Sequence, residues 1–157
     1  QKYKLDISTI GLAGHEAGFP AKPFIKAFDK ARSLGFQTIA HAGETAGAES
    51  VWEAVNYLQP TRIGHGIRAT EDETLLKTLA DKNITLELCP WSNILLGVFT
   101  KETYPIHKII EHQVPFVVAS DDPGLFQKSL EDNFKLLEEI DVPFNISQAS
   151  IKRSLTI

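Results

Sequence analysis

The strongest constraint on this chain is a repeat of short apolar segments, each followed by polar residues that can carry chemistry. Their starts recur about every 30 residues with helical stretches between them, which is typical of successive strand–helix units. The strand-like segments are residues 5–13, 37–40, 62–64, 84–89 and 116–119. The polar groups at their ends are Gly14-His15-Glu16, His41-Ala42-Gly43-Glu44, Gly64-His65-Gly66, Trp91-Ser92-Asn93 and Ser120-Asp121-Asp122-Pro123.

Strands joined by helices predict an α/β fold in which all strands are parallel and end at one edge of the sheet. A complete (β/α)8 barrel takes about 250 residues, whereas this chain has 157. We therefore expect one partial domain over residues 1–157, namely the C-terminal portion of a TIM (β/α)8 barrel with about five βα units. Because a partial barrel leaves strand edges and apolar surface bare, it should self-associate or pair with the missing half.

Helix signals separate the predicted strands. Pro23 is expected at the first position of a helix that Gly35 ends. Another helix is expected over residues 49–58, before Pro60. The run Thr70-Glu71-Asp72-Glu73 predicts a capping box, in which the threonine hydroxyl and the Glu73 carboxylate each bond the other's backbone amide.

The composition argues against several classes of partner. A net charge of −4 and a pI near 5.7 disfavour nucleic acid and anionic membranes. No apolar run approaches the roughly 20 residues of a membrane span. The single cysteine, Cys89, fits a reducing compartment, so a cytoplasmic location is expected. The opening Gln1-Lys2-Tyr3-Lys4 has neither an initiator methionine nor a signal-peptide core, which suggests a piece of a longer protein.

His41 and Glu44 follow the second predicted strand. A histidine at a strand end can bind a metal, and a glutamate three residues later can face the same cavity as a proton donor or acceptor. Gly43 between them allows a sharp turn. A core histidine beside a helix cap has the same spacing, so this pair alone leaves both interpretations open.

Asp121 and Asp122 follow the apolar residues 115–119. Two carboxylates at the end of a buried strand are costly unless a cation or a network of donors holds them. The alternative is a helix cap before Pro123, which accounts for one aspartate more easily than for two.

The other strand ends are less specific. The glycines around His65 indicate either a close ligand or a tight turn, and Gly14 can offer its backbone N–H to a flat ligand or simply form a turn. His15 and Glu16 fit ligand contacts or a salt-bridging pair within the loop. Trp91-Ser92-Asn93 is expected to shape and buttress the pocket. Cys89 is expected in the core, with His107 and His112 on the surface.

Taken together, GLAGHEAGFP, TIAHAGETAG, RIGHG, ELCPWSN and SDDP, in this order and at these spacings, resemble the adenosine deaminase family. The resemblance covers essentially the whole chain, from strand four of the family barrel to the helix after strand eight. It implies a metal-dependent purine hydrolase of the metallo-dependent hydrolase type. The other class of zinc deaminase needs a C-x-x-C pair, which a chain with one cysteine does not have.

The resemblance implies one zinc ion per full-length subunit. His41 and Asp121 would be two of its ligands. Two further histidines would come from the H-x-H of the family's first strand, which this chain lacks. We therefore expect the isolated chain to bind zinc poorly and to be inactive.

The resemblance also implies catalytic roles. Glu44 would protonate purine N1, and His65 would orient or deprotonate the attacking water. Asp122 would bind the attacking hydroxyl and the N7 edge of the purine, and Gly14 would donate its backbone N–H to purine N3.

The implied activity of the full-length protein is hydrolysis of adenosine and 2′-deoxyadenosine to the inosine product and ammonia in purine salvage. Adenine or another 6-aminopurine is the nearest alternative, since SDDP also occurs among adenine-type relatives, while RIGHG favours the nucleoside. His15 stands where many members have an acidic residue, which leaves the finer substrate contacts open. A third interpretation is a non-catalytic interaction module that keeps the shape of a barrel half.

Overall fold

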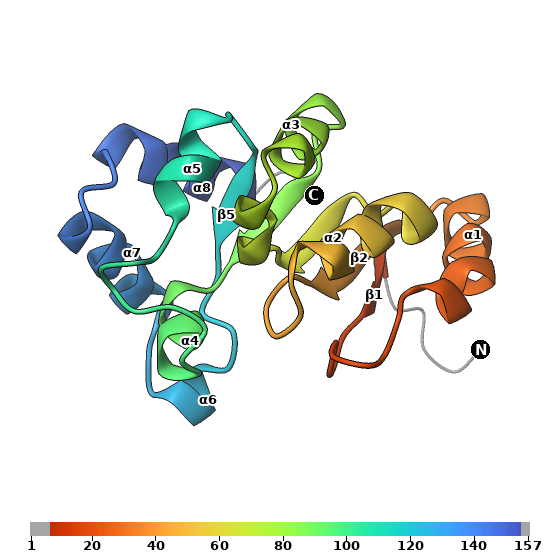
Figure 1. The fold of residues 1–157 in the computed structure, drawn as a ribbon, viewed down its shortest axis with the longest axis horizontal. Coiled ribbons are helices and arrows are strands. Elements are labelled where there is room, and N and C mark those ends of the chain that lie inside the picture. The colour runs from red at the N-terminus through yellow and green to blue at the C-terminus, as the bar shows by residue number, and fades with distance from the viewer. Residues whose placement is uncertain (1–6, 155–157) are drawn as a thin grey trace.

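A five-stranded parallel sheet forms the frame of the protein, and each strand pairs with its neighbours in sequence, in the order β1-β2-β3-β4-β5. The computed structural model describes residues 7–154 (Figure 1). The strands are β1 (Thr9–Leu12), β2 (Gln37–Ala42), β3 (Arg62–His65), β4 (Thr85–Leu88) and β5 (Phe116–Val118). This is the α/β arrangement with five parallel strands that the sequence predicts.

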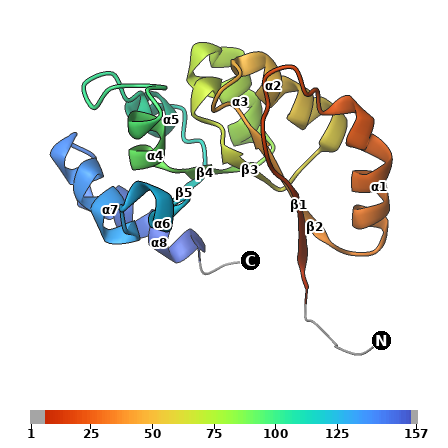
Figure 2. The ribbon, with the colours of Figure 1, turned by 90° about the horizontal axis from the view of Figure 1, so that it is seen from below.

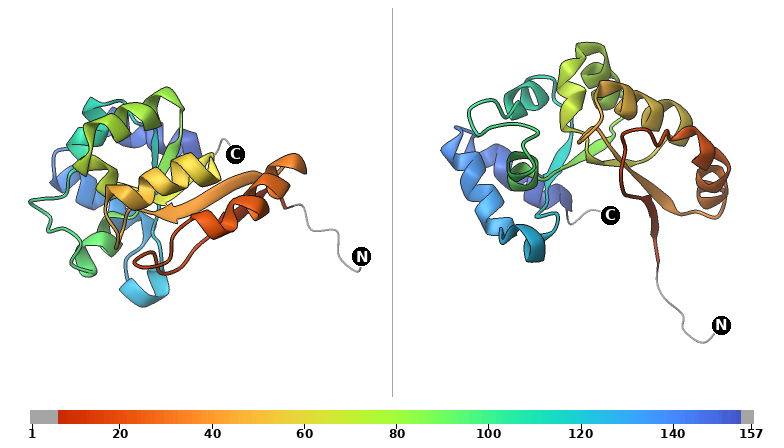
Figure 3. Two further views of the ribbon diagram at one scale, coloured as in Figure 1. Left: turned by 45° about the vertical axis from the view of Figure 1, so that its right-hand side comes forward. Right: turned by 60° about the horizontal axis from the view of Figure 1, so that its bottom comes forward.

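Helices follow every strand. They are η1 (Lys22–Phe24), α1 (Ile25–Ser33), α2 (Ala48–Glu53), the π-helical turn η2 (Ala54–Leu58), η3 (Ile67–Glu71), α3 (Glu73–Asp81), α4 (Pro90–Leu95), α5 (Ile106–Glu111), α6 (Pro123–Phe126), α7 (Leu130–Glu139) and α8 (Phe144–Ser154). Of these, α1, α2, α3 and α5 lie around the outer side of the curved sheet (Figure 2), whereas α4 and α6 lie beyond the ends of the strands (Figure 1). The two views of Figure 3 show the same open arc.

The core lies between the sheet and these helices. Side chains alternate between the two faces of a strand. In β2, Ala40 and Ala42 are buried in the cluster that includes Val51 and Leu58 of the following helical turns. His41, between the two alanines, is therefore directed to the inner face of the sheet. The apolar pattern of β2 thus decides on which side its histidine is presented.

Most element boundaries agree with the expectations from sequence. The helix expected over residues 49–58 is present as α2 and η2, and the strand expected over residues 5–13 is Thr9–Leu12, with residues 5 and 6 outside the described part. Pro23 lies one element earlier than expected, in the 3-10 turn η1 before α1.

None of the helices in residues 7–154 combines the length and the apolar character that a bilayer span demands.

The capping box predicted before α3 is wrong. Thr70 lies in η3 and its hydroxyl donates to the carbonyl of Ile67. The cap is Asp72, whose Oδ1 accepts from the backbone N–H groups of Thr74 at 2.8 Å and Leu75 at 3.2 Å. The extra turn η3 moves the start of the helix two residues along the chain, so the glutamate at 73 cannot face a cap at 70.

Gly66 lets the end of β3 approach the core closely. Its φ of +66° lies in the left-handed region, and a Cβ built on it would meet Leu86 Cδ2 at 2.5 Å. Leu86 is fully buried and has little room to move. Gly97 has a similar φ of +73°, but a Cβ there meets nothing within 4 Å.

We predict that Gly66→Ala destabilises the protein more than Gly97→Ala. Both substitutions place a side chain at a left-handed position, which costs roughly 1–2 kcal/mol. Gly66→Ala adds an overpacking cost of about 1–3 kcal/mol. Urea unfolding of both variants measures the difference in free energy of unfolding, and equal losses would show that Leu86 relaxes freely.

Candidate active site at the ends of β2 and β3

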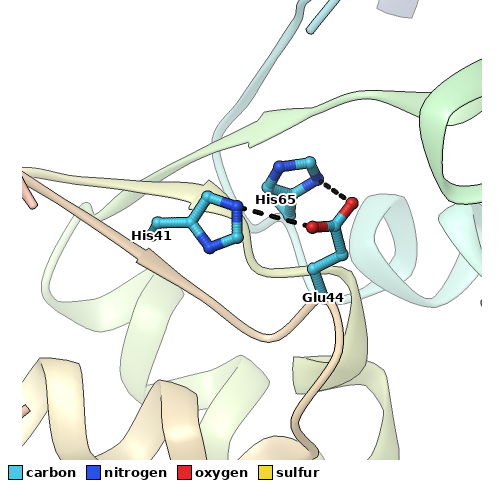
Figure 4. Close-up of side chains that lie close together, drawn as sticks. All are labelled: His41, Glu44 and His65. Carbon is cyan, nitrogen blue, oxygen red and sulfur yellow. Dashed lines mark ion pairs between the residues drawn. The ribbon is translucent and has the colours of Figure 1, made fainter. Parts of the chain in front are cut away.

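Three polar side chains converge at the ends of β2 and β3 (Figure 4). Glu44 stands between two imidazoles: its Oε2 lies 3.4 Å from His41 Nε2, and its Oε1 lies 3.2 Å from His65 Nδ1. The centroids of the two imidazole rings are 4.5 Å apart. The structure therefore brings together three of the residues that the sequence singles out.

The register between β2 and β3 determines that His41 and His65 lie close together. His41 pairs with Gly64 and Ala42 pairs with His65, so the two histidines leave neighbouring strands at almost the same level. His65 has a φ of +59°, and Asp121, after β5, has a φ of +57°. Such left-handed backbone in a residue other than glycine costs about 1–3 kcal/mol and clusters at functional sites.

Helix α4 packs polar side chains against this group. The Asn93 side chain has no exposed surface, and its Nδ2 lies 3.1 Å from Glu44 Oε1 and 3.2 Å from His65 Nδ1. Ser92 Oγ donates to Asp121 Oδ2 at 2.6 Å. These contacts agree with the expectation that residues 91–93 shape and buttress the pocket.

Asp121 lies close to His65 and so adjoins the group formed by His41, Glu44 and His65. Ligand atoms of His65, Cys89 and Asp121 lie within 4.8 Å of one another, as do those of His41, Glu44 and His65. His65 belongs to both sets, so imidazole and carboxylate donors from three strand ends surround one region. Within residues 7–154, no set this tight combines His41 with Asp121.

Asp122 and Gly14 lie at the same end of the sheet and are exposed. Asp122 precedes α6, and its side chain makes no capping hydrogen bond there, which removes the simple cap as its explanation. Gly14 follows β1 with a φ of +122°. Among the described residues, neither is part of the two close sets of metal-ligating side chains.

Glu16 is a site residue to which sequence reasoning assigned no definite role. Its Oε1 lies 2.8 Å from His41 Nδ1, and its Oε2 accepts from the backbone N–H of Gly43 and of Ala46, each at 3.0 Å. The contact with His41 has the distance of an ion pair, although Nδ1 makes no hydrogen bond of good geometry. Only its place between two glycines in a polar loop hinted at this role, because its partners lie almost 30 residues further along the chain.

The contacts set the charges of the group. Burial lowers the pKa of His41, but the carboxylates of Glu16 and Glu44 outweigh burial and raise it to about 9. Burial raises the pKa of Glu16 and of Glu44, but their contacts with His41 hold both below the usual value. For His65 burial dominates, the Glu44 carboxylate offsets it only in part, and the pKa is lowered. Among these side chains alone, protonation is favoured on His41 and disfavoured on His65, beside two carboxylates.

This donor set fits a divalent metal. Imidazole nitrogen and carboxylate oxygen are the ligands that catalytic zinc sites use. Glu16 lies at Nδ1 of His41, so the other ring nitrogen, Nε2, faces the interior of the group. A carboxylate beside one nitrogen of a metal-binding histidine, with the metal on the other, is a recurrent arrangement.

A family model described as "Adenosine deaminase" matches residues 1–150. The chain therefore belongs to the adenosine deaminase family, a class of metal-dependent hydrolases. Proteins named adenine deaminase are similar in sequence: one from Pseudomonas entomophila is 44% identical over 131 residues (83% of this chain, 42% of that protein), and one from Rhizobium leguminosarum bv. trifolii is 42% identical over 146 residues (92% and 44%).

Solved structures agree with the fold. Adenine deaminase from Arthrobacter aurescens superposes with a TM-score of 0.85 at 32% identity, covering 92% of this chain and 45% of that one. An amidohydrolase from Burkholderia ambifaria with bound Zn gives 0.81 at 25% identity, covering 89% and 40%. The barrel class expected from sequence is thus confirmed. The chain spans less than half the length of these relatives.

We predict that Asn93→Leu lowers the free energy of unfolding by about 1–3 kcal/mol, because it removes the Asn93 Nδ2 donor from the buried Glu44 Oε1 and leaves a polar atom without a partner. Asn145, exposed on α8, is the matched control, and Asn145→Leu should change stability little. Chemical denaturation of both variants measures the effect. Equal stabilities would mean that the polar contacts of Asn93 contribute nothing.

Proposed function

We propose that the complete protein hydrolyses the exocyclic amino group of a 6-aminopurine and releases ammonia. The observation that carries the proposal is the arrangement of Glu44 between His41 and His65, with Asp121 next to His65. It combines metal-ligating donors with a proton donor and a proton acceptor in one cluster, of which Glu44 and His65 are buried. The adenine deaminases that resemble the chain support the same reaction class.

His41 and Asp121 are proposed as ligands of a zinc ion, as in the resemblance that the motifs carry, with further ligands supplied by the rest of the protein. The zinc-containing relative from Burkholderia ambifaria supports this metal. Zinc, when bound, lowers the pKa of water from 15.7 to about 7 and so supplies a nucleophile at neutral pH. Residues of this chain are proposed to carry out the proton transfers.

His65 and Glu44 can move a proton from water to the purine. Neutral His65 accepts a proton from the attacking water at Nε2 while its Nδ1–H faces Glu44 Oε1 at 3.2 Å. Glu44 can receive that Nδ1 proton and pass one to N1 of the ring. The water oxygen bonds to C6, its remaining proton passes to the exocyclic amino group, the bond from C6 to that group breaks as the C6 carbonyl forms, and ammonia leaves. Asp122 and Gly14, exposed at the same edge, are proposed to bind the purine.

The substrate is proposed to be adenine in the first place, because the curated relatives described above bear that name. Adenosine and 2′-deoxyadenosine, which the RIGHG motif favours, are the alternatives. Either reaction belongs to purine salvage, and the buried free Cys89 fits a cytoplasmic setting. We also propose that further chain, or a second copy, covers the exposed Ile7 before β1 and the exposed Ile10 within it.

We predict that Glu44→Gln lowers kcat of the complete protein by about 10²–10⁴ because it removes the proton donor. The bound zinc should remain, since His41 and Asp121 are intact. His41→Ala should instead lose the metal. A chelator should abolish activity of the unsubstituted protein, and added zinc should restore it.

Purine absorbance on adenine, adenosine and 2′-deoxyadenosine identifies the substrate, and metal analysis of each variant is the control. A zinc-loaded protein that consumes none of the three purines would contradict the proposal and favour a non-catalytic module.

A further inference from the structure

We propose that Glu16 is a positioning residue, which aims Nε2 of His41 at the metal and holds the loop that carries Glu44. The effect on catalysis rests on the proposed function, whereas the effect on metal affinity does not require the substrate to be known. Glu16 belongs to the loop between β1 and η1, one βα unit before the two residues that it would control.

The first observation is the number of donors that converge on this one carboxylate. Besides His41, it contacts the backbone N–H of Gly43, Glu44 and Ala46 and the hydroxyl of Ser50, at 3.0–3.2 Å. The residue is only 9% exposed. Hydrogen bonds to a buried carboxylate are charge-assisted and stronger than neutral ones. The backbone from residue 43 to residue 46 is thus wrapped around a single anion.

The second observation is that the Glu16 carboxylate contacts Nδ1 of His41 and not Nε2. Glu16 Oε1 lies 2.8 Å from Nδ1, and Nε2 is directed toward Glu44 Oε2 at 3.4 Å. Holding Nδ1 fixes the rotation of the ring and leaves Nε2 as the nitrogen available to a metal. The same carboxylate holds the backbone N–H of Glu44 at 3.1 Å, so one group sets both the metal ligand and the proton donor.

The chain also contains a carboxylate that tethers the loop in which Glu16 lies, but through the other end of that loop and, in the described structure, with no bond to His41 or Glu44. Glu53 of α2 accepts from the backbone N–H of Ala21 through Oε2 at 2.9 Å. Within the described residues, no hydrogen bond or ion pair joins Glu53 to His41 or to residues 43–46. Glu53 therefore provides a matched control for the purely structural contribution of a loop tether.

The test compares Glu16→Gln, Glu16→Asp and Glu53→Gln in the complete protein. Zn²⁺ affinity is measured by chelator competition, melting temperature by calorimetry, and kcat and KM on the active purine. Glutamine has the size of glutamate, but its NH₂ cannot accept from the backbone N–H groups. We expect Glu16→Gln to weaken zinc binding by about 10–100-fold and to lower kcat more than it raises KM.

Glu53→Gln should keep the zinc affinity and kcat of the unsubstituted protein. Glu16→Asp should recover part of the loss, and it keeps the test decisive if Glu16→Gln does not fold. The inference is overturned if Glu16→Gln changes only the melting temperature, or if Glu53→Gln weakens zinc binding equally. A protein that binds zinc but consumes no purine would contradict the proposed function, and the affinity comparison would still test Glu16.

Discussion

The site depends on alternating opposite charges on Glu16, His41 and Glu44, and the Glu44 carboxylate also contacts the neutral His65. A carboxylate or an imidazolium placed alone in this environment would be costly, because burial disfavours the charged form. Here each of these ionised groups neighbours one of opposite sign, and backbone N–H groups together with the Ser50 hydroxyl supply the remaining contacts of Glu16. The contacts of Glu16 therefore fix the conformation of the loops after β1 and β2, so the same interactions that stabilise these loops also position the site residues.

Much of the frame and part of the site could be predicted from residue order. The alternation in β2 directs His41 away from Ala40 and Ala42, and parallel strands bring His41 and His65 to one edge, so their proximity follows from local patterns. The role of Glu16 could not be predicted, because its partners lie 25 to 34 residues away and depend on how two loops close. The start of α3 was misplaced for a different reason: a short turn, η3, separates the strand from its helix and moves the cap to Asp72.

The likeness to known deaminases and the geometry support each other at different levels. The family model and the barrel-shaped neighbours establish the family and the fold. The side chains add what similarity alone does not give, namely that Asn93 and Ser92 of α4 and Glu16 of the loop after β1 hold Glu44 and Asp121 through polar contacts. The relatives are more than twice as long as the matched region. This group of side chains therefore accounts for only part of the proposed active site.

The left-handed backbone at His65 and Asp121 has a consequence for how this sequence can change. At both points glycine would fit the main chain better than the residue that is present. A substitution that relaxes the backbone there would also delete an imidazole or a carboxylate. Screening such a protein for heat resistance alone would thus select against its chemistry at these two positions, so laboratory evolution of this scaffold needs an activity filter from the first round.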